Sequence, residues 1–294
     1  MSSKFLSGQR PADILNYSFL ILLTALTVLF YQKINSAFLL VALYSGLILM
    51  QTVLLAVKDK NRSLRLTYDL IFPTISILVI FDSLEKIVHY INPRDIDTFL
   101  IKADYMLFNG HPTVMLENIM SPFLTDALQI AYSSYYFLPI TLGVVLLIKK
   151  NNSSFDRSLF LIMLCFYLSY VGYLLWPALG PRYTMNHLQN IELKGLFVAE
   201  PIQELLNRLE GVKRDAFPSG HTGIALTVLY LSYCFEKRLF MIFLPFVLAL
   251  IFSTVYCRYH YVVDVLAGVV LALITIILGE KLYEYSKKRF DTYS

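Results

Sequence analysis

The sequence is poor in charged residues. Asp, Glu, Lys and Arg make up only 16% of its 294 residues, whereas soluble domains average about 25%. Apolar residues account for 57% and aromatic residues for 15%, which is more apolar surface than a water-soluble fold hides. The net charge of +4 is too small to indicate nucleic-acid binding. The composition therefore excludes an ordinary soluble protein and favours a membrane protein.

Cysteine is also scarce. Cys165, Cys234 and Cys257 lie far apart and form no Cys-x-x-Cys pair, so the sequence predicts neither a disulfide framework nor a thiolate metal site. We expect all three to be small buried apolar side chains. The polar N-terminal stretch lacks an Ala-x-Ala cleavage site. The first apolar run is therefore interpreted as a retained helix rather than a signal peptide.

Long apolar runs dominate the rest of the chain. A helix needs about 20 mostly apolar residues to span a bilayer, and backbone groups in lipid must be satisfied within the segment. The runs are too long for barrel strands and do not alternate with period two. The predicted fold is all-α, a polytopic membrane bundle of about eight transmembrane helices. The predicted spans are Ile14–Tyr31, Ser36–Val57, Asp69–Ile91, Asp126–Ile148, Ser158–Trp176, Gly220–Phe235, Leu239–Tyr256 and Val262–Tyr283.

Lys and Arg are concentrated in the short loops on the N-terminal side of the predicted bundle, which the positive-inside rule makes cytoplasmic. An even number of spans places both termini on that side. Two longer polar segments, Asn92–Thr125 and Pro177–Ser219, then lie on the non-cytoplasmic face. Asp97 and Asp104 belong to an amphipathic stretch of the first segment. We expect their carboxylates to form a solvated polar face.

One motif marks the start of a predicted span on that face, Pro218-Ser219-Gly220-His221. Proline suits the first turn of a helix because it lacks an N–H, and Gly220 lets a ligand approach the backbone. The unpaired first-turn amides point outward and make an anion site, above all for phosphate. The His221 side chain would lie at the edge of this anion site.

A second motif marks the start of the last span. His260 and Asp264 are four residues apart and so share one helix face. A carboxylate beside an imidazole fixes its tautomer and stabilises the imidazolium, and an intramembrane aspartate needs such a partner. Arg258 adds a guanidinium whose fork suits phosphate oxygens. Arg182, which follows a Gly-Pro pair, adds a second.

This set of groups predicts phosphoryl transfer through a covalent phosphohistidine. His260 would attack phosphorus, and His221 would protonate the leaving alkoxide. A metal site made of the two histidines and Asp264 is the weaker alternative, because two arginines aimed at one place repel a cation. We therefore predict no metal and no cofactor. The predicted phosphate ligands are the side chains of Arg182 and Arg258 and the amides of Ser219 and Gly220.

These motifs resemble those of the type 2 phosphatidic acid phosphatase superfamily of membrane lipid phosphatases and phosphotransferases. That family has an Arg-Pro-containing block, a Pro-Ser-Gly-His block and a block ending His-x3-Asp, and the resemblance covers about Asp97 to Gly268. Gly180-Pro181-Arg182-Tyr183 and Arg258-Tyr259-His260-Tyr261 are most similar to the branch that contains fungal inositol phosphorylceramide synthase. The resemblance implies the same roles for the two histidines and for Asp264.

The chain departs from the family pattern at two cations. Leu175 stands where the common first block has a lysine, and Thr254 where the common third block has an arginine. Arg258, on the same helix face as Thr254, is predicted to replace the second. Lys213 or Arg214 would supply the other cation, or both would belong to a solvated loop.

Three functions remain open from the sequence. The preferred one is a lipid phosphatase that acts on a lipid or polyprenyl phosphate, because hydrolysis requires no second binding site. The alternative is a phosphotransferase with a lipid or polyol acceptor, similar to inositol phosphorylceramide synthase. The third is a transporter or scaffold in which Asp82, Glu85 and Lys86 mark a path, although we expect these three to pair with one another.

The sequence also predicts a division of the chain. Residues 1–91 would form N-terminal transmembrane helices, and residues 92–294 a catalytic membrane domain with an interfacial segment at 92–125. We expect a multi-pass protein of the cell membrane with its active site on the non-cytoplasmic face. The polar-aromatic patch of Tyr132, Ser134, Tyr135 and Tyr136 is interpreted as core packing, with the lining of a lipid pocket as the alternative.

Overall fold

The computed structural model describes residues 9–209 and 212–291. Within these ranges the chain is helical and contains no β-strand, as predicted. The predicted cytoplasmic termini fall on residues 1–8 and 292–294, outside the described ranges. The helices are α2 (Pro11–Leu29), α3 (Ala37–Val57), α4 (Arg62–Leu66), α5 (Phe72–Ile91), α6 (Asp97–Phe108), α7 (Pro112–Met115), α8 (Pro122–Ser133), α9 (Phe137–Ile148), α10 (Asn152–Leu175), α11 (Pro181–Thr184), α12 (Ala199–Leu209), α13 (Gly220–Phe235), α14 (Lys237–Tyr256) and α15 (Val262–Asp291).

Seven helical segments in the described ranges are long and apolar enough to cross a membrane, so the protein is a multi-pass membrane protein. The prediction of about eight differs by one, and the difference is α13. This helix has 16 residues, fewer than a bilayer requires. It packs against α9, α10, α14 and α15, so most of its surface faces other helices, and exposed side chains occur near its end, at Tyr233 and Cys234.

Two of the membrane segments contain an irregular turn between two α-helices. Before α5 the chain makes a π-turn at Thr67–Ile71 (η2), directly before Pro73. Proline cannot donate to the carbonyl four residues earlier, and a wider turn accommodates its ring. Between α8 and α9 the chain tightens into a 3₁₀ turn at Ser134–Tyr136 (η4). Both irregularities lie on the walls of a cavity described below.

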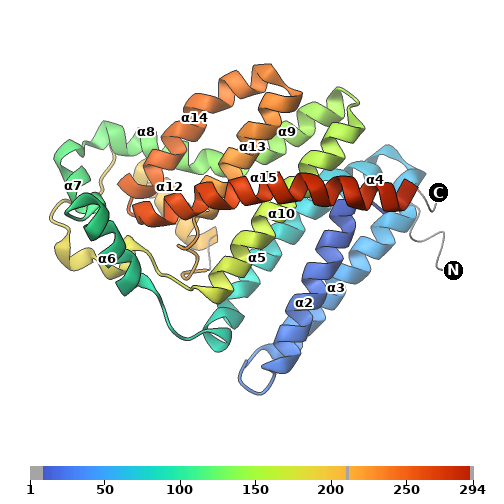
Figure 1. The fold of residues 1–294 in the computed structure, drawn as a ribbon, viewed down its shortest axis with the longest axis horizontal. Helices are drawn as coiled ribbons and strands as arrows, with labels where there is room; N and C mark the ends of the chain where they lie inside the picture. Colours follow the sequence, from blue (N-terminus) through green and yellow to red (C-terminus); the bar gives the residue numbers. More distant parts are fainter. Residues whose placement is uncertain (1–8, 210–211, 292–294) are drawn as a thin grey trace.

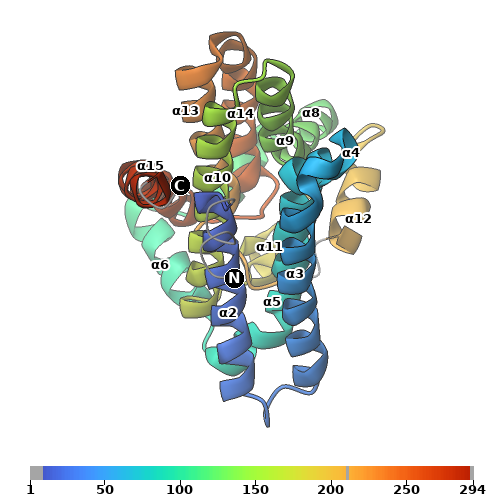
Figure 2. The same cartoon turned by 90° about the vertical axis from the view of Figure 1, so that its right-hand side faces the viewer.

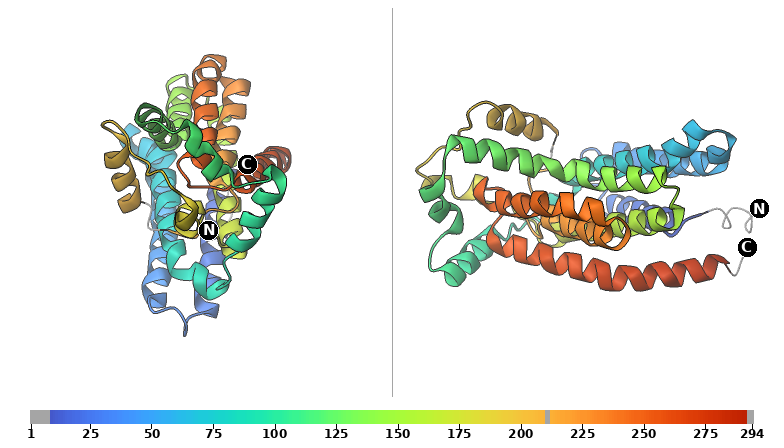
Figure 3. Two further views of the ribbon diagram at one scale, coloured as in Figure 1. Left: turned by 90° about the vertical axis from the view of Figure 1, so that its left-hand side faces the viewer. Right: turned by 90° about the horizontal axis from the view of Figure 1, so that it is seen from above.

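Helices α2 and α3 run side by side, and the long helix α15 crosses the direction of α2, α3 and α10 (Figures 1 and 2). The start of α2 and the end of α15 lie at one end of the bundle, and α6, α7 and α12 lie at the other, which is called the loop end below (Figure 3, right). At the loop end α6 and α12 lie on opposite sides, with α11 between them (Figure 2). The predicted catalytic motifs start α13 and α15 at this end.

The central helix is α10, which contacts α2, α5, α9, α13 and α15. Its link to α2 includes a buried polar group, Asn16. The Asn16 amide nitrogen donates to Gln51 Oε1 at 2.7 Å, and its oxygen accepts from Ser76 at 3.1 Å and from Tyr167 on α10. Such side-chain hydrogen bonds join helices where lipid removes the hydrophobic driving force. The N-terminal helices are thereby fastened to α10.

The cysteines differ from the prediction at one position. Cys165 and Cys257 are buried, but Cys234 is exposed. Cys234 lies near the end of α13, where that helix emerges from its neighbours. An apolar run of this kind does not indicate which of its faces is covered, so the prediction was wrong for this residue.

Candidate active site

The first turn of α13 is fixed by contacts with α10 and α15. The Ser219 hydroxyl accepts from the Thr222 amide at 3.3 Å and caps the helix. The Ser219 N–H donates to the Asp264 carbonyl at 3.0 Å, so this amide is already engaged. A Cβ on Gly220 would lie 2.4 Å from the Tyr173 hydroxyl. Close packing against α10 therefore explains the glycine, and the phosphate-binding role of both residues stays a prediction.

The turn between α14 and α15 brings His260 to His221. Arg258 has a left-handed backbone with φ of 63°, which reverses the chain, and the His260 N–H donates to the Thr254 carbonyl at 3.0 Å. His260 Nε2 then lies 3.4 Å from His221 Nδ1, and both side chains are buried. The two histidines that are 39 positions apart in the chain thus meet, as the motifs predicted.

A hydrogen bond determines which nitrogen of His260 carries the proton. Nδ1 lies 2.8 Å from the Ala216 carbonyl oxygen, and a carbonyl oxygen only accepts. The proton is therefore on Nδ1, and Nε2 carries the lone pair of the ring and faces His221 Nδ1. Asp264 Oδ2 lies 3.5 Å from Nδ1 and also accepts from the Tyr261 N–H at 2.8 Å. This arrangement suits Nε2 to nucleophilic attack, with a carboxylate beside the imidazolium that forms.

His221 lies between two tyrosine rings. Its ring centroid is 4.5 Å from that of Tyr132 and 4.3 Å from that of Tyr135, so the imidazole is held in one orientation. Its Nε2 is buried and has no hydrogen-bond partner among the described residues. Buried polar atoms usually have a partner. This nitrogen is therefore positioned to exchange a proton with a bound substrate.

The two arginines of the motifs lie in different surroundings. The guanidinium carbon of Arg182 is 5.5 Å from the centroid of the Tyr259 ring, within cation–π range. Tyr259 stacks on Tyr132 at 4.2 Å, and Tyr132 stacks on His221. The Arg182 N–H also donates to the Arg258 carbonyl at 2.9 Å. A continuous stack of side chains thus connects Arg182 with His221.

Arg258 instead forms a buried ion pair. Its Nη2 donates to Glu117 Oε1 at 2.8 Å and to the Ile191 carbonyl at 2.7 Å, and both charged side chains are 8% exposed. Glu117 also accepts from the amides of Asn190 and Ile191 at 3.0 and 3.4 Å. Arg258 therefore connects the turn before α15 with the segments around η3 (Leu116–Ile119) and residue 190. Its predicted contact with phosphate stays a prediction.

Asp97 and Asp104 are buried, at 6% and 2% exposure, and the prediction that they form a solvated face was wrong. Asp97 accepts from the amides of Leu179 and Gly180, both at 2.9 Å, and from the Tyr261 hydroxyl at 2.9 Å. It thereby positions the turn that carries Arg182. Amphipathic spacing reveals a polar face but not whether that face meets water or the N–H groups of another helix.

Asp104 performs the same task for the catalytic helix. Its oxygens accept from the amides of Val262 and Val263 at 3.0 and 2.9 Å, the first turn of α15. Burial raises the pKa of Asp104, and the two amides oppose that rise. A fourth acid, Asp126, accepts from the four consecutive amides of residues 196–199 at 2.8–3.2 Å. The sequence contained no signal for these carboxylate clamps, defined here as Asp97, Asp104, Glu117 and Asp126.

Arg214, Asp95 and Glu85 form a separate cluster of charged side chains. The Arg214 guanidinium lies 2.8 Å from Asp95 and 3.8 Å from Glu85, and Glu85 accepts from the Lys213 amide at 3.0 Å. The expected pairing of Glu85 with its neighbours on α5 was therefore wrong. Arg214 is bound to these acids rather than to the histidines, so the missing motif cation is not replaced at that position.

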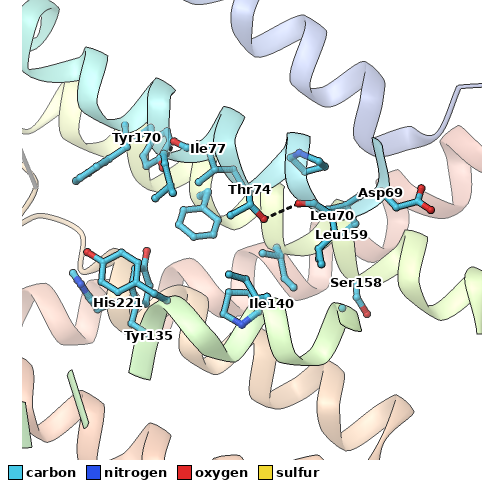
Figure 4. A pocket seen from close by; sticks show the side chains of 18 of the residues that line it. Asp69, Leu70, Thr74, Ile77, Tyr135, Ile140, Ser158, Leu159, Tyr170 and His221 are labelled. Atoms are coloured by element: carbon cyan, nitrogen blue, oxygen red, sulfur yellow. Dashed lines mark hydrogen bonds between the residues drawn. The ribbon is translucent and has the colours of Figure 1, made fainter. Parts of the chain in front are cut away.

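A cavity of about 320 Å³ opens beside His221. It lies between α5, α9 and α10 and is mostly apolar (Figure 4). Tyr135 and Tyr136 line it, so the interpretation of these two as core packing was wrong. Tyr132 is buried in the stack described above. Among the described residues, no group of three or more His, Cys, Asp and Glu side chains is arranged to hold a metal ion.

Comparison with known proteins agrees with the motifs. The model of the PAP2 superfamily matches residues 99–278. The chain is 43% identical over 68 residues to the inositol phosphorylceramide synthase catalytic subunit of Schizosaccharomyces pombe, and 40% identical over 73 residues to that of Saccharomyces cerevisiae. It is 23% identical over 201 residues to a PA-phosphatase related-family protein of Dictyostelium discoideum.

These alignments are partial. They cover 23%, 24% and 60% of this chain and 16%, 16% and 36% of the respective relatives, so the chain spans about a sixth of the two synthase subunits. No solved structure matches. The family match, by contrast, covers more than half of the 294 residues, and it includes both histidine motifs. The chain belongs to the PAP2 superfamily and is a membrane protein of the phosphatase and phosphotransferase type.

Proposed function

We propose that the protein is a lipid phosphatase that cleaves the phosphate ester of a lipid or polyprenyl substrate through a phosphohistidine on His260. The observation that carries the proposal is the pair of contacts made by that ring. Nδ1 is held by the Ala216 carbonyl at 2.8 Å, and Nε2 faces His221 at 3.4 Å. A nucleophile and an acid are thus adjacent, with their orientation set by groups that do not react.

The reaction proceeds in two steps. His260 Nε2 forms a bond to phosphorus as the ester P–O bond breaks, and His221 gives a proton to the leaving alkoxide. Water then attacks phosphorus, the P–N bond breaks, and His221 takes the proton of the water. Asp264 stabilises the imidazolium of the intermediate. Proton transfer by His221 contributes about 10²–10⁴ in rate.

The negative charge of the phosphoryl group that is transferred has to be stabilised by cations. Arg182 is the candidate, since it lies at the end of the stack that leads to His221. Arg258 then acts through its ion pair with Glu117. Residues 92–294 would form the catalytic domain and residues 1–91 a further helical part. The site would face the non-cytoplasmic side of the cell membrane, and the reaction would proceed without a metal ion.

A transferase is the second candidate. The two synthase subunits are the relatives with the higher local identities, 43% and 40%, and they favour a hydroxyl of a second lipid or a polyol as acceptor. The two candidates share the first half-reaction and differ only in what attacks phosphohistidine. The acceptor is therefore the variable that an experiment has to control.

The test uses protein purified in detergent with a chelator present. Wild type, His260→Ala and the control His187→Ala, an exposed histidine, are supplied with phosphatidic acid, polyprenyl diphosphate or phosphatidylinositol, with and without ceramide or diacylglycerol. Free phosphate that disappears only in His260→Ala supports the phosphatase. A new phospholipid without free phosphate supports the transferase, and equal activity of His260→Ala and wild type refutes the mechanism.

A further inference from the structure

The cavity beside His221 is long as well as apolar. His221 lies at one end, and Asp69 and Ser158 lie at the other (Figure 4). Its lining on α10 extends from Ser158 to Tyr173, which at 1.5 Å per residue corresponds to about 22 Å. That is most of the hydrocarbon thickness of a bilayer, about 30 Å. The cavity therefore runs from His221 deep into the membrane part of the bundle.

Its walls are unsuited to a polar ligand. Between the two ends the lining is mostly apolar, with Ile77 and Phe81 on α5, Ile140 on α9, and Leu159 and Ile162 on α10. Two hydroxyls that line it, those of Thr74 and Tyr170, already donate to the carbonyls of Leu70 and Ile77 at 2.8 and 3.1 Å. A head group buried there would lose its hydrogen bonds to water without replacement. A hydrocarbon chain makes no hydrogen bonds to water that it could lose, and it gains apolar contacts with the wall along the whole length of the cavity.

We propose that this cavity holds one hydrocarbon chain of the lipid whose phosphate lies at His221, and that its depth sets the preferred chain length. The inference rests on the proposed function, since it assigns the chain of that substrate. A volume of about 320 Å³ is at the lower limit of ligand pockets, about 300–1,000 Å³, and fits one chain rather than two. One wall is α5, which lies outside the part of the chain matched by the family model.

Charged side chains close the end of the cavity that lies farthest from His221. Asp69 forms an ion pair with Arg10 at 2.9 Å, and Arg10 also lies 3.7 Å from Asp156. A chain that extended further would have to displace this network or bury its charges against hydrocarbon. The network therefore acts as a floor, and chains longer than the cavity fit less well.

Gly143 controls the space just above the floor. A Cβ at this position would lie 3.3 Å from Leu70 Cδ1 and 3.4 Å from Phe155 Cε2, so any larger side chain fills the narrow end. Gly46 on α3 offers a matched control. It is also a glycine of an apolar membrane helix, but nothing lies within 4 Å of its Cβ position, and it does not line the cavity.

The first experiment compares wild type, Gly143→Leu and Gly46→Leu on single-chain lysophosphatidic acids with short and long acyl chains. In Gly143→Leu the ratio of kcat/KM for the long chain to that for the short chain should fall about tenfold or more, because extra volume in a filled space is unfavourable. Gly46→Leu should keep the wild-type ratio. An unchanged ratio in an active Gly143→Leu protein overturns the inference.

The second experiment does not depend on turnover or on a mutated cavity. Photoreactive phosphatidic acid with a diazirine near the end of one chain is crosslinked to wild type and to His260→Ala, and the labelled peptides are identified by mass spectrometry. Labels near Thr74 and Ile140 support the inference, even where no phosphate is released and the proposed function fails. Labels confined to exposed positions of α3 overturn it, even where phosphate release proceeds.

Discussion

The two sides of the candidate site are held in different ways. At the loop end, the carboxylate clamps bind backbone amides directly: Asp97 holds the turn before Arg182, and Asp104 holds the start of α15. On the membrane side, the cavity wall consists mainly of apolar side chains from α5, α9 and α10. The first region is fixed by directional hydrogen bonds to backbone amides, and the second mainly by the packing of apolar side chains.

This difference corresponds to two different tasks. A phosphoryl group must be placed to a fraction of an ångström against His260 Nε2, and directional bonds to buried carboxylates provide that precision. A hydrocarbon chain has no polar atom to align, and close packing without directionality is sufficient. We therefore expect substitutions at the loop end to lower activity strongly and substitutions in the cavity wall to lower it much less. The following mutations test this difference.

The largest effect is expected for Asp264→Asn. The shape is retained, but the carboxylate that lies 3.5 Å from His260 Nδ1 is lost, so the imidazolium intermediate is no longer stabilised. By analogy with the orienting aspartate of serine proteases, kcat should fall by about 10²–10⁴. Steady-state kinetics measures the fall, and an unchanged KM with an unchanged unfolding temperature separates it from a folding defect. A kcat near that of wild type would refute the orienting role.

The next prediction separates the two arginines. Arg258→Ala leaves Glu117 charged, buried and unpaired, which should lower the free energy of unfolding by about 3–5 kcal/mol. Arg182→Ala should leave the stability nearly unchanged but lower kcat/KM by about 10²–10³, as for the loss of other groups that stabilise developing charge. Denaturation in detergent and kinetics measure the two quantities, with Arg62→Ala on α4, an exposed arginine, as control. If both mutations lowered activity with stability intact, Arg258 would be a phosphate ligand after all.

The clamps themselves are tested by Asp97→Ala. This change leaves the amides of Leu179 and Gly180 and the Tyr261 hydroxyl without their acceptor. An unsatisfied buried donor costs about 1–3 kcal/mol, so the unfolding temperature and the activity should both fall. Asp97→Asn, which keeps one acceptor oxygen, should recover part of the loss. Equal stability of Asp97→Ala and wild type would mean that water replaces the carboxylate and that the region is not clamped.

The same two regions show how far the sequence could predict the structure. Composition and long apolar runs predicted the helical membrane fold, because both depend on local properties of the chain. The spacing of His260 and Asp264 predicted a shared helix face, and this was wrong: α15 begins at Val262, so His260 lies in the turn before the helix and approaches Asp264 from there. The burial of Asp97 and Asp104 could not be predicted in this way. Their partners are amides 82 and 158 positions away, and a backbone amide has no residue type that a pattern could detect.

The number of membrane spans and the residues that line the cavity also depend on how the helices pack, so they could not be predicted from one segment of sequence. The run Gly220–Phe235 is as apolar as a membrane helix, but its 16 residues pack against four neighbouring helices, α9, α10, α14 and α15, and such packing is a property of the whole bundle. Tyr135 and Tyr136 were interpreted as core, yet they line the cavity, because the 3₁₀ turn at Ser134–Tyr136 rotates them relative to a regular helix. Neither property is encoded within a single segment.

The smallest effect is expected on the cavity wall. Ile140→Val removes one methyl group from a surface that already borders the cavity. The neighbouring side chains therefore lose few contacts, and the free energy of unfolding should fall by about 0.5–1.5 kcal/mol at most. The short-chain kcat/KM should change less than in Asp97→Asn, although both changes are conservative in shape. Thermal unfolding and kinetics of the two variants side by side measure the contrast. A larger loss in Ile140→Val than in Asp97→Asn would show that the chain-binding side, rather than the clamped side, requires exact geometry.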